Sequence, residues 1–158
     1  MKIGRKWPCI LILLGFSLAA ADGLVGESAG IVVASRGAVT VKSNGESRPM
    51  KQGDFIHVHD EITATDRSFV VLQLADGAKV TLRPVSVLVI EQYQHDAATL
   101  KLVAGSIRVV AGTIVSRNPE NYRIRTPLGL MGMSGSESSL TVCGDKICDQ
   151  QGLVEIEE

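Results

Sequence analysis

The stretch that decides the fold class reads Phe69-Val70-Val71-Leu72-Gln73-Leu74-Ala75-Asp76-Gly77-Ala78-Lys79-Val80-Thr81-Leu82. Two runs rich in Val and Leu flank Asp76-Gly77, a dipeptide typical of hairpin turns because glycine adopts positive φ angles at little steric cost. The stretch therefore predicts an antiparallel hairpin.

Similar short runs extend over most of the chain on both sides of this hairpin. They cover residues 31–34, 38–41, 85–90, 99–103, 107–110, 122–126, 140–142 and 153–156. Arg36-Gly37 separates the first two runs, and Gly105 separates 99–103 from 107–110. Beyond residue 21, no segment keeps a 3.6-residue apolar period for the ten or more residues that a helix needs. We therefore predict an all-β fold of short twisted strands in a solenoid-like or sandwich-like arrangement, with no substantial helix in the mature chain.

The N-terminus has the composition of a secretory signal peptide. A basic head over residues 2–6 precedes an apolar run over residues 10–18, and three alanines follow at 19–21. This order predicts cleavage between Ala21 and Asp22. The apolar run is about half of the ~20 residues that span a bilayer, so cleavage is favoured over a retained anchor.

These features divide the chain into a signal peptide over residues 1–21, an N-terminal linker over 22–29 and an all-β domain over 30–158 that ends in a hairpin. Processing removes three of the 16 Lys and Arg residues and none of the 17 Asp and Glu residues, which leaves a formal net charge of −4. No basic stripe remains, so the composition argues against a nucleic-acid partner. No second long apolar stretch follows, so we expect no transmembrane segment in the mature chain.

Two cysteines, Cys143 and Cys148, remain after processing. An even number in an oxidising compartment favours a disulfide bond. With Asp145-Lys146 as a two-residue turn, Cys143 would face Cys148 across a hairpin. The alternative is a metal or redox pair, although the spacing differs from C-x-x-C.

The segment His57-Val58-His59-Asp60-Glu61 is the first candidate for a ligand site. On a strand, His57 and His59 would point to the same face, as two metal ligands need. Glu61, or His95-Asp96 from elsewhere in the chain, would be the third ligand. The alternative is a solvated strand end with polar residues opposite Val58.

A second segment, Gly132-Met133-Ser134-Gly135-Ser136, partly matches the nucleophile elbow of hydrolases. Ser136 stands where that motif requires glycine, and no strand-turn-helix pattern surrounds it. No calcium-loop motif is present among the many carboxylates. We therefore expect no catalytic residues, no enzymatic activity and no cofactor.

The order of several motifs resembles the FecR domain. These motifs are Gly37-Ala38-Val39-Thr40-Val41, Gly53-Asp54, Ile62-Thr63-Ala64-Thr65 with Ser68, the hairpin at 71–82, Ser86 with Leu88-Val89-Ile90, Leu100-Lys101-Leu102-Val103-Ala104-Gly105 and Tyr122-Arg123-Ile124-Arg125-Thr126-Pro127. The likeness runs from about residue 30 to residue 135. It departs at Ser134, where the family usually has arginine, so any ionic contact of that arginine is missing.

The resemblance implies a non-catalytic all-β module on the outer side of the bacterial inner membrane. In the family's regulators, this domain receives a signal from an outer-membrane transporter, and a cytoplasmic segment controls a sigma factor. In this chain we expect a signal peptide in place of a cytoplasmic segment and a central membrane helix. The resemblance therefore implies a free-standing exported FecR-domain protein.

We expect a periplasmic protein-binding, signalling or scaffolding module whose partner is another envelope protein. The alternative function is a small-ligand or metal-chelate sensor that uses His57, His59 and His95.

Overall fold

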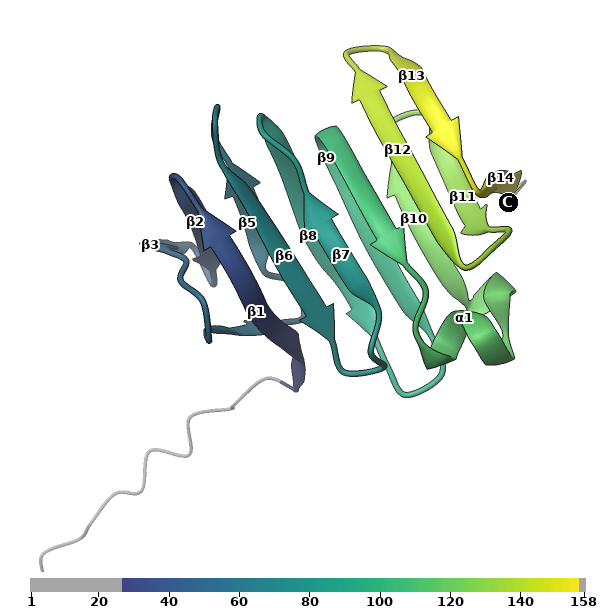
Figure 1. Cartoon of the computed structure of the whole chain (residues 1–158), viewed down its shortest axis with the longest axis horizontal. Helices are drawn as coiled ribbons and strands as arrows, with labels where there is room; N and C mark the ends of the chain where they lie inside the picture. The colour runs from purple at the N-terminus through teal and green to yellow at the C-terminus, as the bar shows by residue number, and fades with distance from the viewer. Residues whose placement is uncertain (1–26, 157–158) are drawn as a thin grey trace, which may run out of the picture.

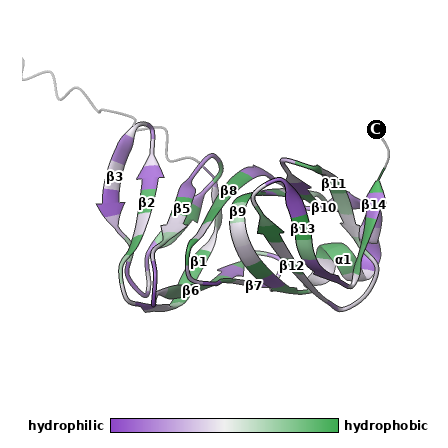
Figure 2. Cartoon of the chain, turned by 90° about the horizontal axis from the view of Figure 1, so that it is seen from above, coloured by the Kyte–Doolittle hydropathy of each residue, from purple (hydrophilic) through white to green (hydrophobic). Residues whose placement is uncertain are grey.

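The computed structural model describes residues 27–156, which form one continuous 14-stranded sheet. The predicted signal peptide and its cleavage site at Ala21–Asp22 lie outside the described residues. The sheet folds over into two facing layers (Figure 1), and the view from above shows that it is strongly curled (Figure 2). The strands are β1 (Ser28–Arg36), β2 (Val39–Ser43), β3 (Glu46–Pro49), β4 (Phe55–His57), β5 (Glu61–Ala64), β6 (Phe69–Leu74), β7 (Lys79–Leu82), β8 (Ser86–Tyr93), β9 (Ala98–Val110), β10 (Tyr122–Thr126), β11 (Gly129–Met133), β12 (Glu137–Cys143), β13 (Lys146–Gln151) and β14 (Leu153–Ile156).

The chain passes back and forth between the two layers. In the first layer the strand order is β4-β1-β6-β7-β9-β12-β13. In the second layer the order is β3-β2-β5-β8-β9-β10-β11-β14. All strand pairs among residues 27–156 are antiparallel except β9 with β10, which run parallel. The prediction of an all-β fold of short strands is confirmed.

Strand β9 belongs to both layers. Its residues 98–104 pair with β8 in the second layer, and residues 105–110 pair with β12 in the first. Gly105 lies at the change of layer with a φ of +86°, which lets the strand bend without ending. The prediction that Gly105 separates two strands is therefore wrong, because the glycine bends one long strand.

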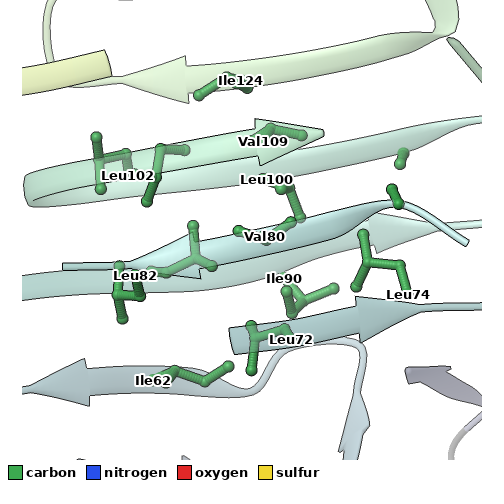
Figure 3. Packing of buried hydrophobic residues seen from close by; sticks show 14 of the residues in the cluster. Ile62, Leu72, Leu74, Val80, Leu82, Ile90, Leu100, Leu102, Val109 and Ile124 are labelled. Atoms are coloured by element: carbon green, nitrogen blue, oxygen red, sulfur yellow. The ribbon is translucent and has the colours of Figure 1, made fainter. Parts of the chain in front are cut away.

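The core lies between the two layers and consists almost entirely of aliphatic side chains. Along β6, for example, Val70, Leu72 and Leu74 are buried, while Phe69 at the start of the strand is exposed. Figure 3 shows Leu72 of the first layer meeting Ile90 of the second. Each such side chain contributes about 1.5–3 kcal/mol when it leaves water, so alternate positions of every central strand hold the layers together.

Two corners show how closely successive segments are packed. At Gly37, between β1 and β2, an added Cβ would lie 2.8 Å from Ser68 Cα. At Gly105 an added Cβ would lie 2.6 Å from Ser86 Cα and 2.4 Å from the carbonyl oxygen of Val85. Both serines are buried, and each follows a residue with positive φ. Val85, predicted as the first residue of a strand, lies instead in the bend that places Ser86 under the glycine.

Among residues 27–156, helical structure is confined to one segment between β9 and β10. It comprises the five-residue helix α1 (Thr113–Arg117) and a 3-10 turn at Pro119–Asn121. Within the described range, no helix has the length and apolar character needed to cross a membrane.

We expect Gly105→Ala to destabilise the protein by about 3 kcal/mol or more, because a side chain in the left-handed region would also collide with the Ser86 segment. Gly45→Ala is the matched control. Gly45 has nearly the same φ, +87°, but open space around it, so strain alone should cost about 1 kcal/mol. Urea unfolding of both variants measures the difference. Equal losses at the two sites would contradict the close approach at the corner.

Candidate functional site

The structure changes the interpretation of the His57–Glu61 segment. Strand β4 ends at His57, and the chain turns through Val58 and His59, where the φ of His59 is +73°. The prediction that His57 and His59 project from one strand face is therefore wrong. The turn forms because the buried carboxylate of Asp60 accepts hydrogen bonds from the His57 backbone N–H (2.9 Å) and the Ser43 hydroxyl.

The third candidate histidine, His95, lies in the turn between β8 and β9. It lines a hollow of about 210 Å³ together with Asp76 and Tyr93, whereas His59 lines a different hollow on the outer face of the second layer. Within residues 27–156, no three His, Cys, Asp or Glu side chains are grouped so that they could share a metal ion. The geometry of the described residues therefore gives no support to a three-histidine ligand set.

The segment Gly132–Ser136 has strand and bend geometry. Gly132 and Met133 lie in β11, and residues 134–136 form a bend that leads into β12. A nucleophile elbow requires a strand, a sharp turn and a helix, and β12 stands where that helix would be. Ser134 and Ser136 instead line an apolar hollow of about 280 Å³ against helix α1.

The β6–β7 turn carries a polar cluster that the sequence alone did not indicate. Oδ1 of Asp76 accepts hydrogen bonds from the Tyr93 hydroxyl (3.0 Å) and the Ala78 N–H (3.1 Å). The Asp76 N–H donates to the Tyr93 hydroxyl (2.7 Å), and the Asp76 carbonyl accepts from the Thr113 N–H (3.0 Å) at the start of α1. An added Cβ at Gly112 would lie 2.4 Å from Asp76 Oδ2, so only glycine fits. The sequence predicted Asp76 as a turn residue alone, because its partners come from other segments.

Two buried tyrosines lie near this aspartate and differ in their hydrogen bonding. Burial raises the pKa of both Tyr93 and Tyr122 well above the usual value, so both hydroxyls stay protonated at neutral pH. The Tyr93 hydroxyl is paired with Asp76 on both of its hydrogen bonds. The Tyr122 hydroxyl has no partner within the part of the chain that the structure describes.

We expect Tyr93→Phe to destabilise the protein by about 1–3 kcal/mol, because it leaves the Asp76 N–H and carboxylate with fewer partners. Tyr122→Phe is the control, since it removes a buried hydroxyl that has no partner among residues 27–156 and should be neutral or slightly stabilising. Thermal and urea unfolding measure both. A larger loss for Tyr122→Phe than for Tyr93→Phe would contradict this assignment.

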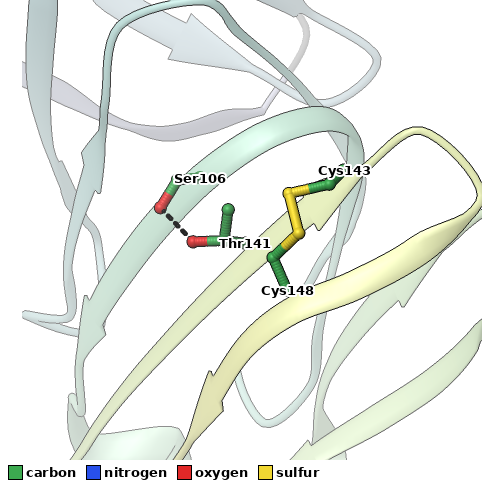
Figure 4. The surroundings of a disulfide bond; sticks show 4 residues. All are labelled: Ser106, Thr141, Cys143 and Cys148. Carbon is green, nitrogen blue, oxygen red and sulfur yellow. Dashed lines mark hydrogen bonds between the residues drawn. A yellow bond between two sulfur atoms is a disulfide. The ribbon is translucent and has the colours of Figure 1, made fainter.

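Cys143 and Cys148 form a disulfide bond across the β12–β13 hairpin, with a Cα–Cα distance of 5.8 Å (Figure 4). The predicted turn at Asp145-Lys146 is wrong by one residue. The turn consists of Gly144 and Asp145, and Cys143 pairs with Lys146. Gly144 has a φ of +62°, as the first central residue of such a turn requires, and a bulge restores the closeness of the two cysteines.

We expect the double variant Cys143→Ser/Cys148→Ser to lose about 2 kcal/mol and to keep its fold, because the bond closes a very short loop. Urea unfolding of this variant and of the native protein with a reducing agent should give the same loss. An unfolded double variant would show instead that the bond holds the domain together.

The four edge strands of the two layers differ in length and composition. At the N-terminal end the edges are β4, with three residues, and β3, which ends in Pro49. At the C-terminal end they are β13, with six residues and no proline, and β14. Among the described residues, β13 pairs only with β12 and β14 only with β11.

This geometry defines the class of the protein. It is a two-layered all-β module with open sheet edges and an aliphatic core. The family model described as FecR protein matches residues 60–155. The chain therefore belongs to the FecR family, whose domain is typically a non-catalytic signalling domain. The match includes β12, β13 and β14 up to residue 155, beyond the resemblance over residues 30–135, and it does not include residues 30–59 of that resemblance.

Other comparisons add little to this family assignment. No curated protein matches the chain significantly. Among solved structures, the chain is similar to a protein described as "Cell surface anchoring domain", with 30% identity and a TM-score of 0.38. That likeness covers 39% of this chain and 83% of the other.

Proposed function

We propose that this chain is an exported, non-catalytic FecR-domain protein of the bacterial cell envelope that binds another protein by accepting one of its strands along β13. The observation that carries the proposal is the asymmetry of the sheet edges. A strand edge with unpaired backbone groups is a template for an added strand, and soluble proteins usually protect such edges.

The N-terminal edges are protected. Pro49 in β3 has no N–H to offer to an added strand. Next to it, Arg48 forms an ion pair of 2.7 Å with Asp54. The Lys51 N–H and the Arg48 guanidinium hold the pKa of the Asp54 carboxyl below its usual value, so this carboxylate stays ionised at neutral pH.

The edge at β13 lacks these features and is held in place before any partner arrives. Its side chains are exposed except for Ile147, which packs against the core. The Cys143–Cys148 bond fixes the β12–β13 hairpin. A preformed edge loses little conformational entropy when a partner strand adds to it, which favours binding.

Three observations support export to the periplasm. The first 21 residues have the composition of a signal peptide, the family is one of signalling domains, and the structure contains a disulfide bond. Disulfide bonds persist in oxidising compartments such as the periplasm.

Site-specific photo-crosslinking in living cells tests the proposal. A photoreactive amino acid at Asp149 or Gln151 in β13 should give an adduct in the envelope fraction, and the protein half of that adduct should begin at Asp22. Because Asp149 and Gln151 lie two residues apart on one strand, their attachment points on the partner should also lie about two residues apart. The same amino acid at Ser47 in β3 is the control and should give no adduct. Adducts from Ser47 alone, or no adduct from β13, would contradict strand addition at this edge.

A further inference from the structure

The outer face of the second layer carries a hollow of about 440 Å³ across β8, β9 and β10. Its lining comprises His59, Glu91, Gln92, Thr99, Arg123 and Arg125. The parallel pairing of β9 with β10 places Arg123 beside Thr99 and Arg125 beside Lys101. These four side chains alternate with buried core residues, so the same strands that build the core project them outward.

Positive charge exceeds negative charge at this hollow. The lining contains two cations, Arg123 and Arg125, and one carboxylate, Glu91, and Lys101 lies beside that carboxylate. That carboxylate accepts a hydrogen bond from Arg125 Nε at 3.0 Å and lies 3.8 Å from Lys101 Nζ. Arg123 uses only Nε, which donates to the Glu120 carbonyl oxygen at 3.2 Å. The full chain has a formal net charge of −1, so the positive charge of this surface is opposite in sign to the net charge of the chain.

Several hydrogen-bonding side chains at the hollow have no partner among residues 27–156. These are the Thr99 hydroxyl, the Gln92 amide and the His59 imidazole. The backbone of His59 is held in the left-handed region, and its N–H donates to the Ile90 carbonyl oxygen at 2.7 Å. The turn therefore holds the imidazole at the rim of the hollow at a cost in backbone strain.

We propose that this hollow binds a phosphate group, with the Arg123 guanidinium and the Thr99 hydroxyl as its main donors. An arginine fork and a hydroxyl from adjacent strands approach a ligand from two directions, which suits a tetrahedral anion with three or more acceptor oxygens. The volume exceeds that of a single phosphate, so the ligand carries the phosphate on a larger body, such as a sugar or a lipid headgroup.

Glu91 leads to a prediction about the affinity of the hollow for phosphate. The Glu91 carboxylate pairs with Lys101 and Arg125. Its negative charge repels an anion that binds next to these two side chains. Removing this charge while keeping the shape should remove that repulsion. Glu91→Gln should therefore bind phosphate more tightly, by about three- to tenfold.

Isothermal titration of the purified protein with glucose 6-phosphate, inorganic phosphate and acetate tests the proposal. We expect binding of both phosphates and weaker binding of acetate. Arg123→Gln should lower the affinity about tenfold or more, since it removes a charge-assisted donor. Arg36→Gln is the matched control, because it makes the same change of charge at an exposed arginine at the end of β1. It should change the affinity less than twofold.

Flotation with vesicles of phosphatidylcholine, with and without phosphatidylglycerol, distinguishes the two sources of phosphate. Binding to phosphatidylglycerol vesicles that Arg123→Gln abolishes assigns the site to a lipid headgroup, and titration of glucose 6-phosphate alone assigns it to a soluble ligand. Three results would overturn the proposal: no phosphate bound in either experiment, equal losses for Arg123→Gln and Arg36→Gln, or weaker binding by Glu91→Gln.

Discussion

The close contact between Gly105 and the Ser86 segment is the constraint on which the two-layered structure depends. Strand β9 must change layer at this point, and it does so while its backbone touches that of the preceding bend. The Ser86 hydroxyl accepts a hydrogen bond from the Ser106 N–H at 2.8 Å, so a donor at the corner is satisfied inside the protein. Since β9 is the strand that belongs to both layers, a side chain at Gly105 would separate the halves of the sheet that it joins.

This construction leaves the molecule with two kinds of surface. The curled sheet does not close, so edge strands remain at both ends, and they differ in length, proline content and side-chain pairing. The outer faces carry every second side chain of strands whose other side chains fill the core. Polar chemistry therefore collects on rows of outward positions, as with Arg123 and Arg125 on β10. The edge and the face offer separate means of contact: backbone groups at β13 and charged side chains over β8–β10.

Much of the fold could be predicted because patterns of neighbouring residues determine many of its strands and turns. Strands β6 and β7, the Asp76-Gly77 turn and the end of β10 before Pro127 all lie where the sequence places them. Two errors occurred where a distant segment decides the local geometry. The His59 N–H bonds the Ile90 carbonyl oxygen in a turn, and Gly105 bends a strand because Ser86 lies beneath it. The Asp76–Tyr93 pair was missed for the same reason, since neither residue is unusual in its own segment. The one-residue error at the Cys143–Cys148 hairpin is local, since it comes from a bulge within that hairpin.

By itself, the sequence determined the all-β class and the alternation of core and surface positions, and it favoured the pairing of Cys143 with Cys148. These follow from periodicity, turn residues and short-range spacing, which act within a few neighbouring residues. The order of its motifs resembled the family to which the chain belongs. Only the tertiary structure decided which strands share a layer, which edges are open and which charges meet around Glu91. Those features depend on register between strands that are far apart in the chain, and that register is fixed only when the layers pack against each other.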